Sequence, residues 1–280
     1  MQPTAAIRDI RVVIDLGGDL RPVEVALDLA GKLDAHVTGV SLAFQPIIPV
    51  YTMAAPVPTD FIVSAHDHAV ADAKAASERF EAMARAGGVE FEARSIDSMP
   101  GDGFAGAVRH FQLADVAIIG QQDPDRPEPM REGLIEAILF QAGAPVLLVP
   151  YSGVHEFKSD RVVIAWDGGA MAARAVRNSL PLLYRAKHVD AVVVAEDRKL
   201  LGTPGAGVGR YLSRHGLDVE VHEIAGSGDI ASSILEFAAE TRADWMLMGA
   251  YGHSRVREFF LGGVTSGMLS TATLPIFMAH

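Results

Sequence analysis

The chain has 280 residues, 49% hydrophobic and 21% charged, which suits two globular domains and excludes a chain disordered by composition. Its 35 acidic residues outnumber the 24 basic ones, and a formal net charge of -11 argues against nucleic acid or an anionic membrane surface as a partner. The absence of cysteine excludes disulfides and thiolate metal sites. We expect a cytoplasmic protein, because the sequence shows neither a signal-peptide pattern nor a run of roughly 20 apolar residues.

In the first half, short apolar runs alternate with helical patterns. Strands are expected at Arg11–Ile14, Ala114–Gly120 and Pro145–Val149, and a long helix near Phe61–Ala86. The polar, glycine-containing segment Tyr151–Asp160 follows and is typical of a linker.

The second half has the same alternation, which indicates βαβ units around a parallel sheet. Strands are expected near Arg161–Trp166, His188–Ala195, Asp218–Ile224, Asp244–Gly249 and Pro275–Ala279. Helices are expected at Ala170–Tyr184, Ala206–His215, Asp229–Thr241 and Gly263–Ser270.

Three short sequences recur in the same order in both halves. Arg11–Ile14 recurs as Arg161–Ile164, Ala114–Gly120 as Ala243–Gly249, and each half closes on an apolar strand after a proline. This order predicts tandem copies of one domain, at 1–150 and 151–280. The first pair lies 150 residues apart and the later two 129 and 130 apart, so we place about twenty extra residues in the first half, at the proline-rich run 44–60.

The loop that follows the strand at 244–249 is rich in glycine. Ligands bind open parallel sheets beyond the carboxyl ends of the strands, where glycines let the backbone approach a ligand. Gly249, Gly252, Gly262 and Gly263 lie in this loop, and the helix that begins at Gly263 offers free N–H groups to a phosphate, with Thr265 as a further donor. A purely structural glycine-rich lead-in to a helix has the same spacing, so both interpretations stay open here.

The loop resembles the signature of the universal stress protein family, G-x2-G-x9-G-[S/T]. Gly249, Gly252 and Gly262 match it, whereas Gly263 stands where the family has Ser or Thr, so a backbone donor remains and a hydroxyl is lost. Thr265 falls where members often carry a further hydroxyl. The resemblance covers both halves as a fold and the second half as a motif.

The resemblance implies two Rossmann-like α/β domains of the adenine nucleotide alpha hydrolase type. Each would be a five-stranded parallel sheet in the order 3-2-1-4-5, flanked by helices, with ATP or AMP bound in some members and absent in others. Mg²⁺ is expected only together with the nucleotide. Because strand five lies at a sheet edge through which family dimers often meet, we expect Val146–Val149 and Ile276–Ala279 to face each other in an internal pseudo-dimer, and leave a homodimer of chains open.

Three further side chains are candidates for the nucleotide site. Asp167 is similar to the acidic residue that borders the adenosine pocket in the family, and its alternative role is to shape the turn before the helix at Ala170. Arg255 is placed to reach phosphates but is also typical of a solvated loop. His253 lies near the same site, and without a partner in the sequence it is not assigned as a base.

The first half lacks this motif. Gly120 matches the first glycine, but residues 121–133 carry four acidic and two basic side chains and three prolines, which withhold backbone donors. Asp15 need not occupy the place of Asp167. The first site is therefore predicted to be degenerate.

No metal site is evident from the sequence. His66 and His68 lie two apart on a predicted helix and point to different faces, and no cluster of His, Asp and Glu shows ligand spacing. The leading hypothesis is a stress-response module that binds an adenine nucleotide in its second half. The alternatives are a nucleotide-free interaction protein of the same fold and an enzyme, either a slow ATPase or a relative of the adenylating α/β enzymes, which is disfavoured because no general base or ligand set is visible.

Overall fold

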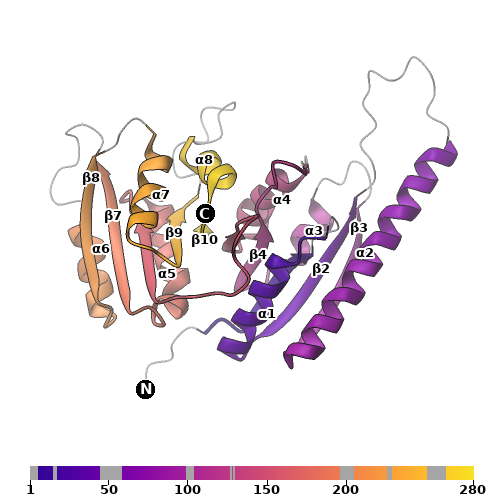
Figure 1. Ribbon diagram of the computed structural model, residues 1–280, viewed down its shortest axis with the longest axis horizontal. Helices are drawn as coiled ribbons and strands as arrows, with labels where there is room; N and C mark the ends of the chain where they lie inside the picture. The colour runs from indigo at the N-terminus through magenta and orange to yellow at the C-terminus, as the bar shows by residue number, and fades with distance from the viewer. Residues whose placement is uncertain are drawn as a thin grey trace, which may run out of the picture.

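The computed structural model is an elongated α/β protein built on one continuous ten-stranded sheet (Figure 1). It describes residues 6–14, 18–44, 59–98, 104–126, 128, 130–195, 205–225, 229–250 and 263–280. The strands lie in the order β3-β2-β1-β4-β5-β10-β9-β6-β7-β8. Each half therefore has the predicted order 3-2-1-4-5, and the two halves share one sheet.

The first half contains β1 to β5 and α1 to α4. Its strands are β1 (Asp9–Ile14), β2 (His36–Phe44), β3 (Phe91–Ser98), β4 (Val116–Gly120) and β5 (Val146–Val149). Its helices are α1 (Arg21–Leu33), α2 (Thr59–Gly87), α3 (Ala105–Arg109), α4 (Arg131–Ala137) and the π-helical turn η2 (Ile138–Ala142). The long helix expected at 61–86 is α2, which extends past the end of the sheet in Figure 1.

The second half contains β6 to β10 and α5 to α8. Its strands are β6 (Arg161–Ala165), β7 (His188–Ala195), β8 (Val219–Ala225), β9 (Trp245–Gly249) and β10 (Ile276–Ala279). Its helices are α5 (Ala170–Leu183), α6 (Ala206–Arg214), α7 (Ile230–Glu240) and α8 (Gly263–Thr271). All nine elements predicted for this half are present, with no end displaced by more than one residue.

Helices cover both faces of the sheet. One core combines side chains of α1, α2, α5 and α6 with alternate strand residues, and the other combines those of α3, α4, η2, α7 and α8. The central strands β4, β5 and β10 are buried along their whole length, as continuous apolar runs require.

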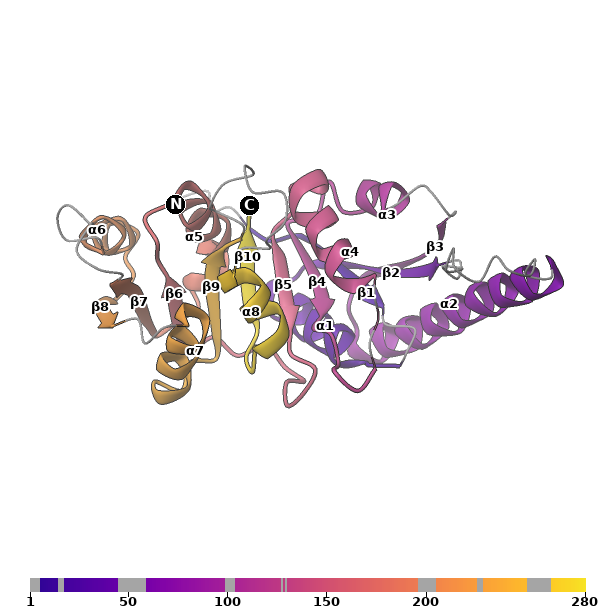
Figure 2. The same ribbon diagram turned by 90° about the horizontal axis from the view of Figure 1, so that it is seen from above.

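The two fifth strands join the halves. β5 and β10 pair antiparallel, with Ile276 opposite Leu148, Phe277 opposite Leu147 and Met278 opposite Val146, and Figure 2 shows them side by side in the middle of the molecule. All other strand pairs in the sheet are parallel. The predicted internal pairing is confirmed, and it closes two apolar edges that would otherwise be open templates.

The linker 151–160 packs against both halves. Phe157 is 3% exposed; its N–H donates to Asp28 of α1 (2.7 Å), and its carbonyl accepts from Lys32 (2.8 Å). Its ring lies 5.6 Å, centroid to centroid, from that of Trp245 in the second half, whose indole N–H donates to Ser159. The linker is therefore an ordered connection, although its polarity alone predicts only a spacer.

One predicted correspondence between the halves is wrong by two residues. The Asp115 carboxylate accepts from the N–H groups of Arg8 and Asp9, and the Asp244 carboxylate accepts in the same way from Asp160 and Arg161. Strand one of the first half is thus offset by 152 residues from β6, not by 150 as the matched sequences suggest.

Candidate functional site

The ends of β6 and β9 lie next to each other. The two strands are parallel, with Ala165 opposite Met248, so the segments that leave them, at Asp167 and Gly249, emerge at the same edge of the sheet. The chain turns back over this edge as α5. The structure therefore brings two of the predicted site residues to one place.

Gly249 is in close contact with the first turn of α5. A Cβ atom at this position would lie 2.4 Å from the backbone nitrogen of Ala172 and 2.7 Å from the carbonyl carbon of Met171. Only glycine lets the strand end pass so near the helix. The first glycine of the motif thus has a structural reason of its own.

Asp167 shapes the turn that starts α5. Its Oδ1 accepts a 2.7 Å hydrogen bond from the N–H of Gly169, the residue that caps the helix. Between them Gly168 has a φ of +76°, a left-handed conformation that favours glycine. The turn-forming role of Asp167 is present, and contact with a ligand stays a prediction.

The first turn of α8 has free space around Gly263, whereas Thr265 is buried. Among the described residues, no atom beyond its chain neighbours and its own helix backbone lies within 4 Å of the place where a Cβ of Gly263 would be. Thr265 is only 4% exposed and is one of the buried residues of α8, with Met268 and Leu269. Thr265 is therefore a buried residue of α8, and its role as a hydroxyl donor to a ligand stays a prediction. The other four predicted site residues, Gly252, His253, Arg255 and Gly262, lie outside the described residues.

The corresponding strand end in the first half is covered by an arginine. Arg131 is 7% exposed, and its Nη1 donates to the carbonyl of Gly120 at the end of β4 (3.0 Å), while Nη2 donates to Glu128 (2.5 Å). A Cβ at Gly120 would lie 3.0 Å from Pro22 of α1 and 3.2 Å from this guanidinium. Asp15, the first-half residue compared above with Asp167, lies outside the described residues.

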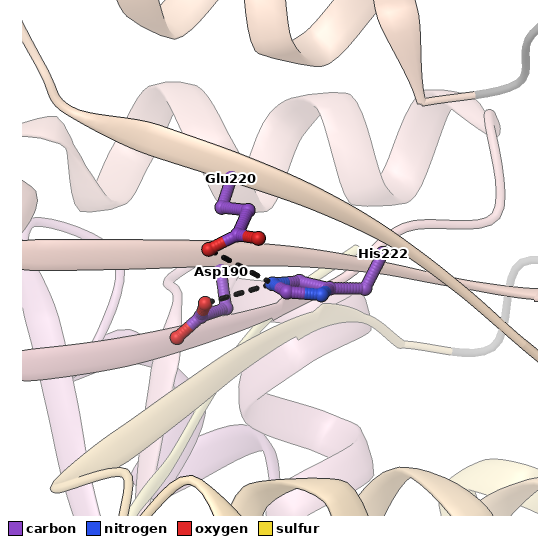
Figure 3. A group of neighbouring side chains, drawn as sticks. All are labelled: Asp190, Glu220 and His222. Atoms are coloured by element: carbon purple, nitrogen blue, oxygen red, sulfur yellow. Dashed lines mark hydrogen bonds and ion pairs between the residues drawn. The ribbon is translucent and has the colours of Figure 1, made fainter.

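The structure brings together a cluster that we did not predict. Asp190 of β7 and Glu220 and His222 of β8 place ligand-type atoms within 4.8 Å of one another (Figure 3). Arg161 of β6 donates to Asp190 from the neighbouring strand. The expectation that no cluster of His, Asp and Glu has ligand spacing is therefore wrong. Glu220 and His222 are two residues apart on a strand, so they share a face, and the register places Glu220 opposite Asp190.

The equivalent positions in the first half contain arginine instead of histidine. By strand register, Glu92 and Arg94 of β3 correspond to Glu220 and His222. Glu92 and Arg94 form a salt bridge of 2.9 Å, which lowers the pKa of Glu92 and raises that of Arg94. Arg94 also lies 3.4 Å from Nδ1 of His110.

His110 is expected to make the protein less stable in mild acid. Burial, and then the charges of Arg94 and Arg11, lower the pKa of His110 from its ordinary value of 6.5. The unfolded chain therefore binds a proton that the folded protein resists, so the free energy of unfolding should fall as the pH drops below about 6.5. Urea unfolding from pH 7.5 to 5 should show a smaller loss for His110→Gln than for the wild type. The same change at the exposed His68 is the control, and an equal effect of the two substitutions would contradict the assignment.

Comparison with known proteins gives a consistent picture. Residues 158–280 match the model of the universal stress protein family. A universal stress protein of Synechocystis sp. is 26% identical over 152 residues, covering 51% of this chain and 49% of the relative, so the chain spans about half the length of that relative. A second, from Methanocaldococcus jannaschii, is 24% identical over 139 residues, covering 42% of this chain and 80% of the relative.

Two solved structures share the whole architecture. A universal stress protein from Archaeoglobus fulgidus superposes with a TM-score of 0.71 at 17% identity, over 97% of this chain and 95% of that one. A protein of unknown function from Pseudomonas aeruginosa gives a TM-score of 0.61 at 15% identity, over 98% and 92%. At such identities the likeness shows the fold alone.

Proposed function

This chain belongs to the universal stress protein family through its residues 158–280, and we propose that it binds one adenine nucleotide, ATP or AMP, in this half. The observation that carries the proposal is the shared edge at the ends of β6 and β9, with Asp167 and Gly249 beside each other and α8 beginning at an open Gly263. The function would be that of a cytoplasmic stress-response module that senses or stores the nucleotide.

The topology supports this position. From β6 the chain crosses to β7 on one side, and from β9 it crosses to β10 on the other, so the strand order reverses between these two neighbours. Ligands of open α/β sheets bind outside the carboxyl ends of the strands at such a switch point. The nucleotide would lie over this edge, with the adenosine near Asp167 and the phosphates toward the start of α8.

The remaining contacts rest on the family motif. We propose that Gly252 and Gly262 let the backbone approach the phosphates and that Gly263 contributes its N–H. Arg255 would neutralise phosphate charge, and His253 would lie beside it without acting as a base. Mg²⁺ would enter only with the nucleotide.

The first half is proposed to have no nucleotide. The buried guanidinium of Arg131 lies at the end of β4, where Nη1 donates to Gly120 and Nη2 donates to Glu128. The acidic, proline-rich segment that follows would repel phosphates and offers them few donors. We therefore propose two domains with different roles, residues 1–150 as a partner domain and 151–280 as the nucleotide-binding domain.

Native mass spectrometry of freshly purified protein tests the proposal, followed by calorimetric titration with ATP and AMP. We expect one nucleotide per chain and loss of binding in Gly252→Val, because a branched side chain would block the approach of the backbone. The matched change Gly263→Ser should keep binding or strengthen it by about 1 kcal/mol, roughly fivefold, through one added hydrogen bond.

Four outcomes would contradict this assignment or favour an alternative. Two equivalent sites per chain would show that the first half also binds, and unchanged affinity of a folded Gly252→Val would make the loop structural. No binding at all would favour the interaction protein. Turnover of labelled ATP, measured alongside, would favour the slow ATPase.

A further inference from the structure

We propose that Asp190, Glu220 and His222 bind one divalent transition-metal ion, for which Zn²⁺ is the probe. The three residues lie on β7 and β8, the last two strands at one end of the sheet, and near the amino ends of these strands. The proposed nucleotide site is at the opposite, carboxyl end of this parallel sheet. The metal site is therefore independent of it.

The separations of the ligand atoms suit a metal ion. Nε2 of His222 lies 2.9 Å from Oδ1 of Asp190 and 3.9 Å from Oε2 of Glu220, and all three atoms point into one space (Figure 3). Zinc bonds to nitrogen and oxygen are about 2.1 Å long, so tetrahedral ligand atoms are about 3.4 Å apart. The two observed distances bracket this value, and small side-chain rotations would equalise them.

Arg161 orients the buried ligand. Asp190 is 2% exposed, and Arg161 donates to both of its oxygens, from Nε to Oδ2 (2.7 Å) and from Nη2 to Oδ1 (3.1 Å). The bond to Asp190 is the first cause of the raised pKa of Arg161. A carboxylate oxygen has a second lone pair, so Oδ1 can bind an ion while Arg161 fixes its direction, as outer partners of metal ligands commonly do.

One side of the site is covered by an aromatic ring, and the other side is exposed to solvent. The ring of His222 lies 4.9 Å, centroid to centroid, from that of Phe237 on α7, and the His222 side chain is 24% exposed. Glu220 is 74% exposed, so it can rotate onto an ion without disturbing the core. One position of a four-coordinate ion would remain for water or a further ligand.

In the first half, a positively charged side chain lies at the corresponding position. There the position of His222 is held by Arg94, which lies against Glu92, and the position of Asp190 is held by the uncharged Thr38. In the second half an imidazole replaces the guanidinium and a buried carboxylate is added. With His222 neutral, Arg161, Asp190 and Glu220 leave one net negative charge, which a bound cation would compensate.

Imidazole makes the site selective. Nitrogen ligands suit zinc, copper and nickel, whereas Mg²⁺ and Ca²⁺ prefer oxygen ligands alone and more of them than this site offers. Zn²⁺ should therefore bind in the presence of excess Mg²⁺. Bound Co²⁺ should give visible absorption bands typical of a low-coordinate site.

Calorimetric titration of the metal-stripped full chain with ZnCl₂, without nucleotide, tests the proposal. We expect one high-affinity site per chain, weakened 10- to 100-fold or more in Glu220→Gln and in His222→Arg, which places the guanidinium of the first half at this position. The matched control is Glu92→Gln, the equivalent change in the first half, which should leave zinc binding unaltered. Unfolding curves establish that each variant is folded.

The proposal is overturned if the wild type binds no stoichiometric zinc, if both variants bind it with wild-type affinity, or if Glu92→Gln weakens binding as much as Glu220→Gln. Should His222→Arg fail to fold, Glu220→Gln decides, because its side chain is largely exposed. Loss of the Co²⁺ bands in Glu220→Gln would support the assignment independently of calorimetry.

Discussion

Replacement of Ile276 by lysine is expected to destabilise the whole protein by about 4 kcal/mol or more, because it places a charge where no partner is available. Ile276 is fully buried and lies between Leu148 of β5 and Met246 of β9. Domains of this kind are stable by only about 5–15 kcal/mol, so the loss is a large part of the total. The midpoint of urea unfolding should fall sharply or the variant should not fold.

The structure shows which part of the protein this substitution should affect. From the sequence alone, a charge in strand five is expected to separate or destabilise the halves, because the strand is taken as a sheet edge. In the structure β10 is an interior strand of one sheet and is buried along its whole length, so the core of the second half should be lost as well. Spectroscopic signals that report on either half should be lost together in one unfolding transition.

Val221→Lys is the matched control. Val221 lies on β8, the last strand of the same sheet, and is 39% exposed, so the lysine can reach water. Its cost should stay within about 1 kcal/mol, as for most partly exposed positions. Equal losses in the two variants would show that the junction of β5 and β10 is not a closed, buried interface.

The fold was largely predictable because two independent regularities agree. Alternation of apolar runs with helical patterns locates every element of the second half, and the family resemblance supplies the strand order. The pairing of β5 with β10 was expected because the family resemblance implies dimers that meet through this strand, and because short apolar edge strands are normally covered. Within the described ranges, no helix is both long enough and apolar enough to cross a membrane.

The residue-by-residue correspondence between β1 and β6 could not be derived from the similarity of their sequences. Arg11–Ile14 and Arg161–Ile164 look alike because both are apolar strands preceded by arginine, yet the sheet aligns Asp9 with Arg161. A shift of two residues leaves the same side chains facing the same core, so the burial pattern does not oppose it. The register is revealed by the hydrogen bonds that the carboxylates of Asp115 and Asp244 accept from backbone N–H groups at the start of β1 and β6.

The two candidate sites differ in what the sequence reveals. The residues of the glycine-rich loop are close together in the sequence, so their spacing can be seen there. The nucleotide ligand was inferred from the family resemblance and not from this spacing. Asp190 lies thirty residues before Glu220, and only the register of β7 against β8 brings them together. The one visible signal was Glu220 and His222 two apart in a predicted strand, which places them on one face.

Gly249→Ala is expected to destabilise the second half even without nucleotide, by about 1–3 kcal/mol, the usual cost of overpacking. The new Cβ would lie 2.4 Å from the backbone nitrogen of Ala172 and 2.8 Å from Cβ of Met171. These atoms belong to the first turn of α5, which cannot move aside like the end of a flexible side chain. Either β9 or α5 must shift, and the turn at Asp167 would shift with it.

Gly263→Ala separates this packing effect from any general effect of glycine replacement. In the described part of the chain, no atom beyond its chain neighbours and its own helix backbone lies within 4 Å of the added Cβ. Alanine in a helix is favoured over glycine by roughly 0.5–1 kcal/mol, so stability should be unchanged or slightly higher. Urea unfolding of the two variants without nucleotide gives the comparison. If Gly249→Ala unfolds at the wild-type midpoint, the close approach to α5 does not require glycine at this position. If the same variant is stable but no longer binds nucleotide, Gly249 is needed for the ligand instead.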